Sequence, residues 1–303
     1  MTRSCLGCAS SSASIRASRR SGSLAESTSL SSHLRSTEKL VPGAIRITNR
    51  GGAGGTIGLA EFAKSRGEGG SLMVMGLVMI GAIVTNKSAV TLEGVTPTAR
   101  LTSEYLVIAV PAASKVQTLR DFTDALRKNP GAITIAGGSR GGPDHILAAL
   151  VAESVGVPGA KVNYVAYAGG GDAVASLLGA QVAAGISGYG EFEAHIESNK
   201  LRALAISAPA RIRGMDAPTL KEQGVNLDFG GWHGVVAPAA ISVPDRQALL
   251  DLIDRMVKSA TWKSELRKHN WEDAYLAGDA FARFVKAETE RVTSVVKSAG
   301  LVK

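Results

Sequence analysis

Residues 133–147 read Ile133-Thr-Ile-Ala-Gly-Gly-Ser-Arg-Gly-Gly-Pro-Asp-His-Ile-Leu147. The β-branched start predicts a strand, the four glycines predict a loop, and Pro143 opens a segment with apolar residues at helical spacing. Glycines let backbone N–H groups approach a ligand closely, and a helix N-terminus favours negative charge. Arg140 adds a guanidinium that can grip a carboxylate through two parallel hydrogen bonds. We therefore predict a strand, an anion-binding loop and a helix.

The same order of strand, glycine- or serine-rich loop and helix recurs on both sides of this stretch. Glycine-rich or serine-containing loops follow predicted strands at 49–58, 169–172 and 187–190. Thr118 is a predicted N-cap for a helix that ends at Lys128. The repeated pattern predicts an α/β fold with a parallel sheet and ligand-binding loops at the strands' carboxyl ends. A short strand is predicted from Trp232, and everything beyond Val243 is predicted to be helical.

Composition limits the classes of function. The chain has 303 residues, of which 45% are hydrophobic, so it is long enough for two domains or one large α/β domain. Residues 1–40 hold six Lys/Arg and two Asp/Glu, so half of the net charge of +8 lies there. The rest shows no basic stripe with interleaved aromatic residues, which argues against nucleic acid. The longest apolar run, 72–84, has 13 residues, whereas a membrane span needs about 20.

Metal and cofactor signatures are missing from the sequence. Both cysteines lie in the first eight residues, and the histidines lack the spacing of a zinc motif. The 49–58 loop has Ile57 where a dinucleotide fingerprint needs glycine, and no Lys-Ser or Lys-Thr pair follows it. We expect no metal and no cofactor.

The N-terminal segment differs from the rest of the chain. Residues 1–36 contain 13 serines, five arginines and almost no periodic apolar residues, so we expect residues 1–38 to be disordered or non-native. No apolar region follows Met1, so no export signal is visible. We expect two lobes beyond this segment, joined by two strands. Residues 39–108 and 233–303 would form lobe 1, and 109–232 lobe 2, with the ligand in the cleft between them.

Residues 40–301 resemble the solute-binding receptors of tripartite tricarboxylate transporters, the Bug-type periplasmic binding proteins. The resemblance rests on the segments at 49–58, 137–145, 162–172, 200–207, 217–224 and 231–238. It implies the two-lobed Venus-flytrap fold of type II periplasmic binding proteins. In this family an export signal, the first strand and the first helix stand where this chain has residues 1–36. The resemblance therefore implies that the first strand and helix of lobe 1 are missing or replaced, through a wrong start or reading frame upstream of Thr37 or a degenerate gene.

The resemblance also implies a function without catalysis. A periplasmic, monomeric receptor would capture citrate or a C4-dicarboxylate and deliver it to the membrane permease subunits of the transporter. The ligand-binding residues expected from the residues and the resemblance are Ser139, Arg140, Gly141, Gly142, His145, Gly169, Gly170, Gly171, Asp172, Thr56, Gly76, Leu77 and Tyr189.

Alternative interpretations remain for several of these residues. Gly137 to Gly141 fits G-x-S-x-G, so Ser139 is a candidate nucleophile of a serine hydrolase. Its partners would be Asp172 or Asp245 and His233 or His269, although the helix should then start directly after the serine. A degenerate relative that binds nothing is the third interpretation. Asp144 is more simply a helix cap, and the glycines of 51–58 could only allow close packing.

Overall fold

The computed structural model describes residues 11–18, 44–167, 170–212 and 214–302. The chain divides into two compact units. The first comprises Met1–Ser103 and Trp232–Arg291, and the second comprises Glu104–Gly231 and Val292–Lys303. Val292–Lys303 thus groups with the second unit, whereas residues 233–303 were all expected in lobe 1.

The sheet of the first unit has the strand order β2-β1-β3-β9-β4, and β10 pairs with β4. The printed pairings β1–β2, β1–β3, β3–β9 and β10–β4 are antiparallel. The strands are β1 (Ser11–Ser18), β2 (Ala44–Gly51), β3 (Ser71–Gly76), β4 (Val95–Pro111), β9 (Gly230–Pro238) and β10 (Glu272–Ala277).

Two strands of this unit were not predicted. β1 lies in the segment for which no regular structure was expected, and it pairs on both sides, with β2 and β3. β10 lies in the segment expected to be entirely helical, and it pairs with β4 from Glu272 to Ala277. β1 alternates Ala13, Ile15 and Ala17 with serine and arginine, a short pattern inside a serine-rich segment, and β10 has no strict alternation. Backbone pairing with neighbouring strands defines both.

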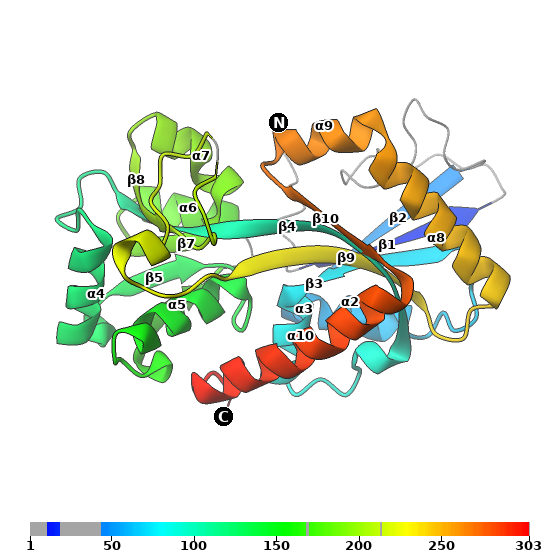
Figure 1. Ribbon diagram of the computed structural model, residues 1–303. Helices are drawn as coiled ribbons and strands as arrows, with labels where there is room; N and C mark the ends of the chain where they lie inside the picture. Colours follow the sequence, from blue (N-terminus) through cyan, green and yellow to red (C-terminus); the bar gives the residue numbers. More distant parts are fainter. Residues whose placement is uncertain (1–10, 19–43, 168–169, 213, 303) are drawn as a thin grey trace. The chain divides into compact units, whose positions relative to one another are not determined.

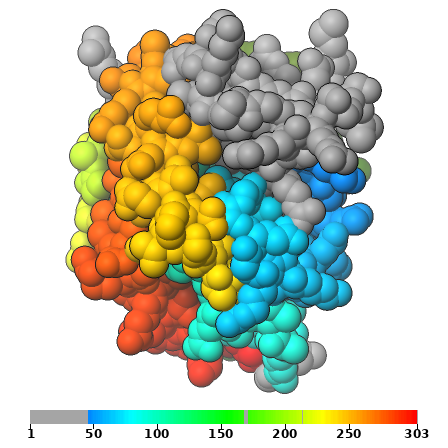
Figure 2. All heavy atoms as spheres, turned by 90° about the vertical axis from the view of Figure 1, so that its right-hand side faces the viewer, coloured from blue at the N-terminus to red at the C-terminus, as the bar shows by residue number. Residues whose placement is uncertain are grey.

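The helices of the first unit are α2 (Thr56–Phe62), α3 (Leu77–Thr85), α8 (Val243–Lys258), α9 (Ala260–Lys268) and most of α10 (Gly278–Ser298). α8 and α9 cover one face of the sheet, where Leu249, Ile253 and Trp262 pack on apolar residues of β3, β4 and β9. Figure 2 shows the outer surface of α8 in yellow, beside α9 in orange. Residues 72–84, expected to be core rather than membrane span, form β3 and α3 and are largely buried.

The sheet of the second unit has the order β4-β7-β5-β6, and β8 also pairs with β4. Its further strands are β5 (Thr134–Gly137), β6 (Asn163–Ala166), β7 (Ala184–Gly188) and β8 (Leu201–Ile206). β5 is parallel to β6 and to β7, as the repeated strand-loop-helix pattern predicts. The predicted parallel pairing therefore holds for β5, β6 and β7, whereas β4 is antiparallel to both β7 and β8.

Helices cover both faces of this second sheet. Figure 1 shows α4 (Leu119–Lys128) and α5 (Pro143–Ser154) on one face, and α6 (Gly170–Leu178) and α7 (Tyr189–Glu197) on the other. Val174, Leu177 and Phe192 pack on β4 and β5 residues of one face. Ile146, Leu147 and Val151 of α5 are completely buried. This packing fixes α5, whose N-terminus carries the predicted site.

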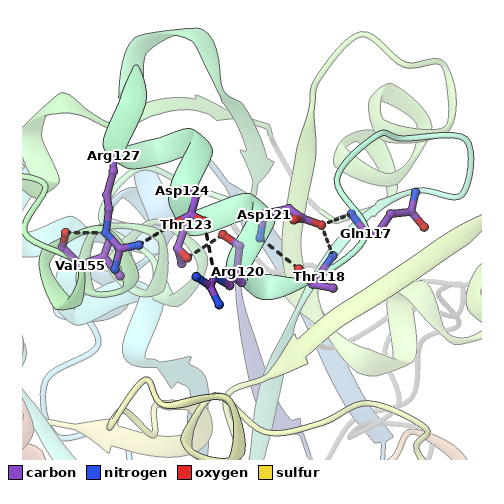
Figure 3. A network of polar contacts seen from close by, with 8 residues as sticks. All are labelled: Gln117, Thr118, Arg120, Asp121, Thr123, Asp124, Arg127 and Val155. Carbon is purple, nitrogen blue, oxygen red and sulfur yellow. Dashed lines mark hydrogen bonds and ion pairs between the residues drawn. The ribbon is translucent and has the colours of Figure 1, made fainter.

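Figure 3 shows the polar contacts that anchor α4 and, through it, the far end of α5. Thr118 caps α4 as predicted, because its hydroxyl accepts from the Asp121 N–H while the Asp121 carboxylate accepts from the Thr118 N–H. Arg127 pairs with Asp124 at 2.6 Å and donates to the carbonyl of Val155, the C-cap of α5, at 3.3 Å.

None of the helices within the described ranges combines the length and apolar character needed to cross a membrane.

Candidate functional site

The loop between β5 and α5 is the centre of the candidate site, and its predicted strand, loop and helix are confirmed. β5 ends at Gly137 and α5 begins at Pro143. Between them, the Gly142 N–H donates to the carbonyl of Ser139 at 2.9 Å and closes a turn. Gly141 has φ +77°, a conformation that residues with a Cβ rarely adopt. The turn therefore presents Ser139 and Arg140 at its tip.

Three side chains hold this loop in shape. The carboxylate of Asp144 accepts from the Gly138 N–H at 2.7 Å, and Nδ1 of His145 accepts from the Gly141 N–H at 3.0 Å. The hydroxyl of Tyr164 donates to the carbonyl of Gly138 at 2.9 Å, and its ring stacks on His145 with 4.2 Å between centroids. The loop is thus braced from α5 and from β6.

This bracing uses most of the backbone donors that the glycines were expected to offer a ligand. The N–H groups of Gly138, Gly141 and Gly142 are all satisfied within the loop. Gly141 and Gly142 therefore shape the loop, and their N–H groups do not point at a ligand in this arrangement. The donors at the tip are the backbone and side chains of Ser139 and Arg140.

Burial sets the charge states beneath the tip. It raises the pKa of Asp144 to about 7, against the lowering by the Gly138 N–H, and the carboxylate of Glu191 raises it further. Burial also lowers the pKa of His145 to about 4, and the nearby Arg140 guanidinium adds to that effect. His145 is therefore neutral at pH 7. Because its Nδ1 accepts a hydrogen bond, the proton of the ring lies on Nε2.

Arg140 is exposed, whereas Asp144 and His145 are buried. Within the described part of the chain, Arg140 forms no salt bridge and the Ser139 hydroxyl forms no hydrogen bond. The tip thus offers an uncompensated positive charge and a hydroxyl donor. An anion is the chemical complement of this pair.

The other predicted loops of the second unit differ from expectation. Gly169 lies outside the described residues. α6 begins at Gly170, so Gly170, Gly171 and Asp172 belong to the first turn of a helix, not to a loop. β7 passes directly into α7, so the expected 187–190 loop is absent. Both differences arise because the glycines sit at helix N-termini, where local composition resembles a loop.

Tyr189 is the first residue of α7 and is only 6% exposed. It packs in the apolar cluster formed by β4, α6 and α7. Burial and the carboxylates of Glu193 and Glu197 raise its pKa. These contacts fit the simpler interpretation, in which Tyr189 caps the core.

The first unit holds the three remaining predicted residues, and each has a structural role there. The Thr56 hydroxyl donates to the carbonyl of Ala53 at 2.9 Å, and a Cβ on Gly54 would lie 2.5 Å from Cβ of Ala82. These contacts favour close packing as the reason for the 51–58 glycines. A Cβ on Gly76 would lie 2.4 Å from the Trp232 carbonyl oxygen. Leu77 is 1% exposed, so it belongs to the core instead of lining a binding surface.

The geometry does not support a serine hydrolase. Three residues lie between Ser139 and the start of α5, whereas a nucleophile elbow passes directly into its helix. The His145 ring contacts the Gly141 N–H, and Nε2 of His269 lies 3.1 Å from the Glu265 carboxylate. No histidine in the described ranges is hydrogen-bonded to Ser139. Nor do those ranges contain a cluster of three residues able to ligate a metal.

Sequence reasoning did not find Tyr164 and Glu191, and for Asp144 it favoured a helix cap over ligand contact without foreseeing the bond to the loop. Tyr164 is one residue of a strand pattern, and its hydroxyl reaches the loop only because β6 lies beside β5. Glu191 faces Asp144 from α7. An Asp in the first turn after a glycine loop was the available signal, since such a carboxylate can bond back to the loop.

Comparison with known proteins identifies the family. The profile described as "Tripartite tricarboxylate transporter family receptor" matches residues 34–301. The chain belongs to this receptor family. A UPF0065 protein from the TAR-I ttuE-ttuC' intergenic region of Agrobacterium vitis is 25% identical over 88% of this chain and 78% of its own length. BugT of Bordetella pertussis is 28% identical over 84% of this chain and 79% of its own.

Solved structures show the same fold, and one of them is a receptor of the TctC type. A TctC solute-binding protein from Polaromonas, without ligand, is 26% identical with a TM-score of 0.64, covering 82% of this chain and 85% of that one. MatC from Rhodopseudomonas palustris, with bound malate, is 22% identical with a TM-score of 0.70, covering 81% and 85%. An R. palustris protein with adipate is 21% identical with a TM-score of 0.74, covering 83% and 85%.

These comparisons confirm the predicted receptor family and the α/β fold of its periplasmic binding proteins. The family comprises receptors, not enzymes, so the prediction that the chain is not an enzyme is also confirmed.

Proposed function

We propose that this receptor captures a small di- or tricarboxylate outside the cytoplasm and delivers it to the membrane subunits of a tripartite tricarboxylate transporter. The observation that carries the proposal is the tip of the 138–142 loop. There, Ser139 and the exposed Arg140, which has no salt bridge to any residue that the structure describes, project from a loop in which the N–H groups of Gly138, Gly141 and Gly142 are already satisfied. Family membership and the malate- and adipate-bound relatives support a carboxylate as the ligand.

The chemistry of the tip suits a carboxylate. A guanidinium can donate two parallel hydrogen bonds to the two oxygens of one carboxylate, and the Ser139 hydroxyl can donate a third. The neutral imidazole of His145 braces the loop and adds no positive charge of its own. Arg140 is therefore the main electrostatic determinant. We further propose that the receptor is periplasmic and acts as a monomer, as expected for its family.

Isothermal titration calorimetry with citrate, succinate, malate, adipate and benzoate tests this function. Hydrogen bonds to charged groups contribute about 1.5–3 kcal/mol. We therefore expect Arg140→Ala to weaken binding of the best ligand about 10- to 100-fold, and Arg140→Lys to weaken it less. Arg120→Ala is the matched control, because Arg120 is also an exposed arginine but lies on α4 in a pair with Asp124.

The outcomes separate the interpretations. Binding that is lost in Arg140→Ala and retained in Arg120→Ala supports the receptor and this loop. Binding that Arg140→Ala leaves unchanged refutes the role of the tip. If no carboxylate binds, the interpretation of a degenerate relative is the better one. Ester turnover that disappears in Ser139→Ala would instead restore the hydrolase.

A further inference from the structure

We propose that carboxylate binding at the 138–142 loop is coupled to the uptake of one proton by Asp144. This inference rests on the proposed function, since it concerns the same ligand at the same loop. It adds a property that the receptor's family does not specify: affinity that falls as the pH rises, controlled by a residue that does not touch the ligand.

The position of Asp144 carries the argument. Its side chain is 8% exposed and lies against the backbone of the loop. A Cβ built on Gly137 would lie 2.8 Å from Cβ of Asp144, and one built on Gly138 would lie 3.1 Å from its Oδ2. Oδ2 itself accepts from the Gly138 N–H at 2.7 Å. The carboxyl group is thus enclosed against Gly137 and Gly138, which directly precede the two residues of the tip.

Titratable groups on α7, β6 and α5 surround Asp144. Glu191 of α7 faces it with a second carboxylate, which accepts from the Ser187 hydroxyl at 2.6 Å. Tyr164 of β6 interacts electrostatically with both Asp144 and Arg140, and its hydroxyl donates to the Gly138 carbonyl. The neighbouring His145 on α5 is neutral. Among the described residues no cation forms a salt bridge with Asp144, so its negative charge is poorly compensated.

A bound carboxylate changes this balance in one direction. It places another negative charge at the tip of the loop that Asp144 braces. A nearby negative charge favours the protonated form of Asp144. The protonated carboxyl group can still accept from the Gly138 N–H through its carbonyl oxygen, so the loop keeps its shape. Ligand and proton therefore bind cooperatively, and each raises the affinity for the other.

The ionisation of Asp144 falls in a range that can be measured. Burial, with the help of Glu191, raises its pKa to about 7, so the unliganded protein is partly protonated near neutral pH. Above that pH the proton must be taken up on binding. Affinity then falls by up to about tenfold for each pH unit, the limit for a single linked proton.

Calorimetry with malate at pH 6.0, 7.0, 8.0 and 8.5 tests the coupling, with two buffers of different ionisation enthalpy at each pH to count protons. We expect affinity to fall toward high pH, with proton uptake of up to one per ligand. Asp144→Asn keeps an oxygen that accepts from Gly138 and should make the affinity independent of pH. Glu191→Gln should move the fall to a lower pH, because loss of the Glu191 charge lowers the pKa of Asp144. Equal affinity of the wild type at pH 6.0 and 8.5 would overturn the proposal, as would an unchanged slope in Asp144→Asn.

A second measurement covers the case in which Asp144→Asn does not fold. The ionisation of the Asp144 carboxyl group can be followed through the NMR chemical shift of its carbon in the wild-type protein, without and with saturating malate. Malate should raise the pKa of this carboxyl group, and an unchanged pKa overturns the proposal. If none of the carboxylates binds, the proposed function falls and the coupling falls with it. If they bind without pH dependence, only the coupling falls.

Discussion

Replacing Asp144 by Asn should stabilise the unliganded protein at high pH and have little effect at low pH. The carboxyl group is protonated in the folded state up to about pH 7, whereas in the unfolded chain it ionises near its ordinary pKa of 3.8. Below pH 3.8 both states carry the proton. Between 3.8 and 7 only the folded state holds it, so the group's contribution to stability is lost as the pH rises. Above 7 the folded protein bears a buried, poorly compensated charge.

The size of the effect follows from the difference between these two pKa values. At about 1.4 kcal/mol for each pKa unit, the difference corresponds to at most about 4 kcal/mol. Asn removes the charge and keeps the acceptor for the Gly138 N–H. For a domain of about 150 residues, 1 kcal/mol shifts Tm by about 2–4 °C. We therefore expect Asp144→Asn to match the wild type near pH 4 and to exceed its Tm by several degrees at pH 8.

Thermal unfolding of both proteins between pH 4 and 8, followed by circular dichroism, measures this difference. Asp172→Asn is the matched control, since Asp172 is exposed in the first turn of α6. There a negative charge is favoured by the helix dipole. Its removal should lower the free energy of unfolding by less than about 1 kcal/mol, and so lower Tm only slightly. Parallel pH profiles for Asp144→Asn and the wild type would refute the reasoning, because they would mean that Asp144 ionises alike in both states.

Three further substitutions, one of them with a matched control, test the scaffold of the site. Gly141→Ala should destabilise the protein by about 1–2 kcal/mol in urea unfolding, because Gly141 has φ +77°. Gly171→Ala, in open space in the first turn of α6, should instead be neutral or stabilising, and equal effects of the two changes would contradict the role of the turn. Tyr164→Phe should lower stability by about 0.5–1.5 kcal/mol through loss of its bond to Gly138 and weaken malate binding, and an unchanged affinity would show that this brace is dispensable. Thr118→Ala should cost about 0.5–2 kcal/mol through the α4 cap without changing affinity, and a changed affinity would show that α4 influences the loop.

The sequence predicted the elements whose signals are local. Apolar periodicity predicted most helices, and Thr118 was correctly predicted as the N-cap of α4. The glycines around Ser139 predicted the loop between β5 and α5. It failed where pairing between distant segments decides the structure. β1 has only a short alternation within a serine-rich segment, and β10 has none. β4 runs antiparallel to β7 and β8 although the chain repeats a parallel motif.

The site shows the same division. That residues 137–145 form a ligand loop was a prediction from glycines and Arg140, but the destination of each N–H group was not predictable. It depends on whether Asp144, His145 and Tyr164 turn toward the loop, and that follows from burial and from the neighbouring strand. From composition alone, every glycine of the loop was an equal candidate to bind a ligand through its N–H group. The structure separates those that shape the loop from the residues that remain free to bind.

The satisfied glycines change how the loop would recognise a ligand. A cradle of free N–H groups would accept many anions and would gain its order from the ligand. Here Asp144, His145 and Tyr164 already satisfy the backbone, so the loop keeps its shape before a ligand arrives and little ordering entropy is lost on binding. Discrimination between anions then depends on the tip, where the planar guanidinium of Arg140 favours a planar carboxylate. The buried carboxyl group beneath it penalises additional negative charge, and this penalty disappears when Asp144 takes up a proton.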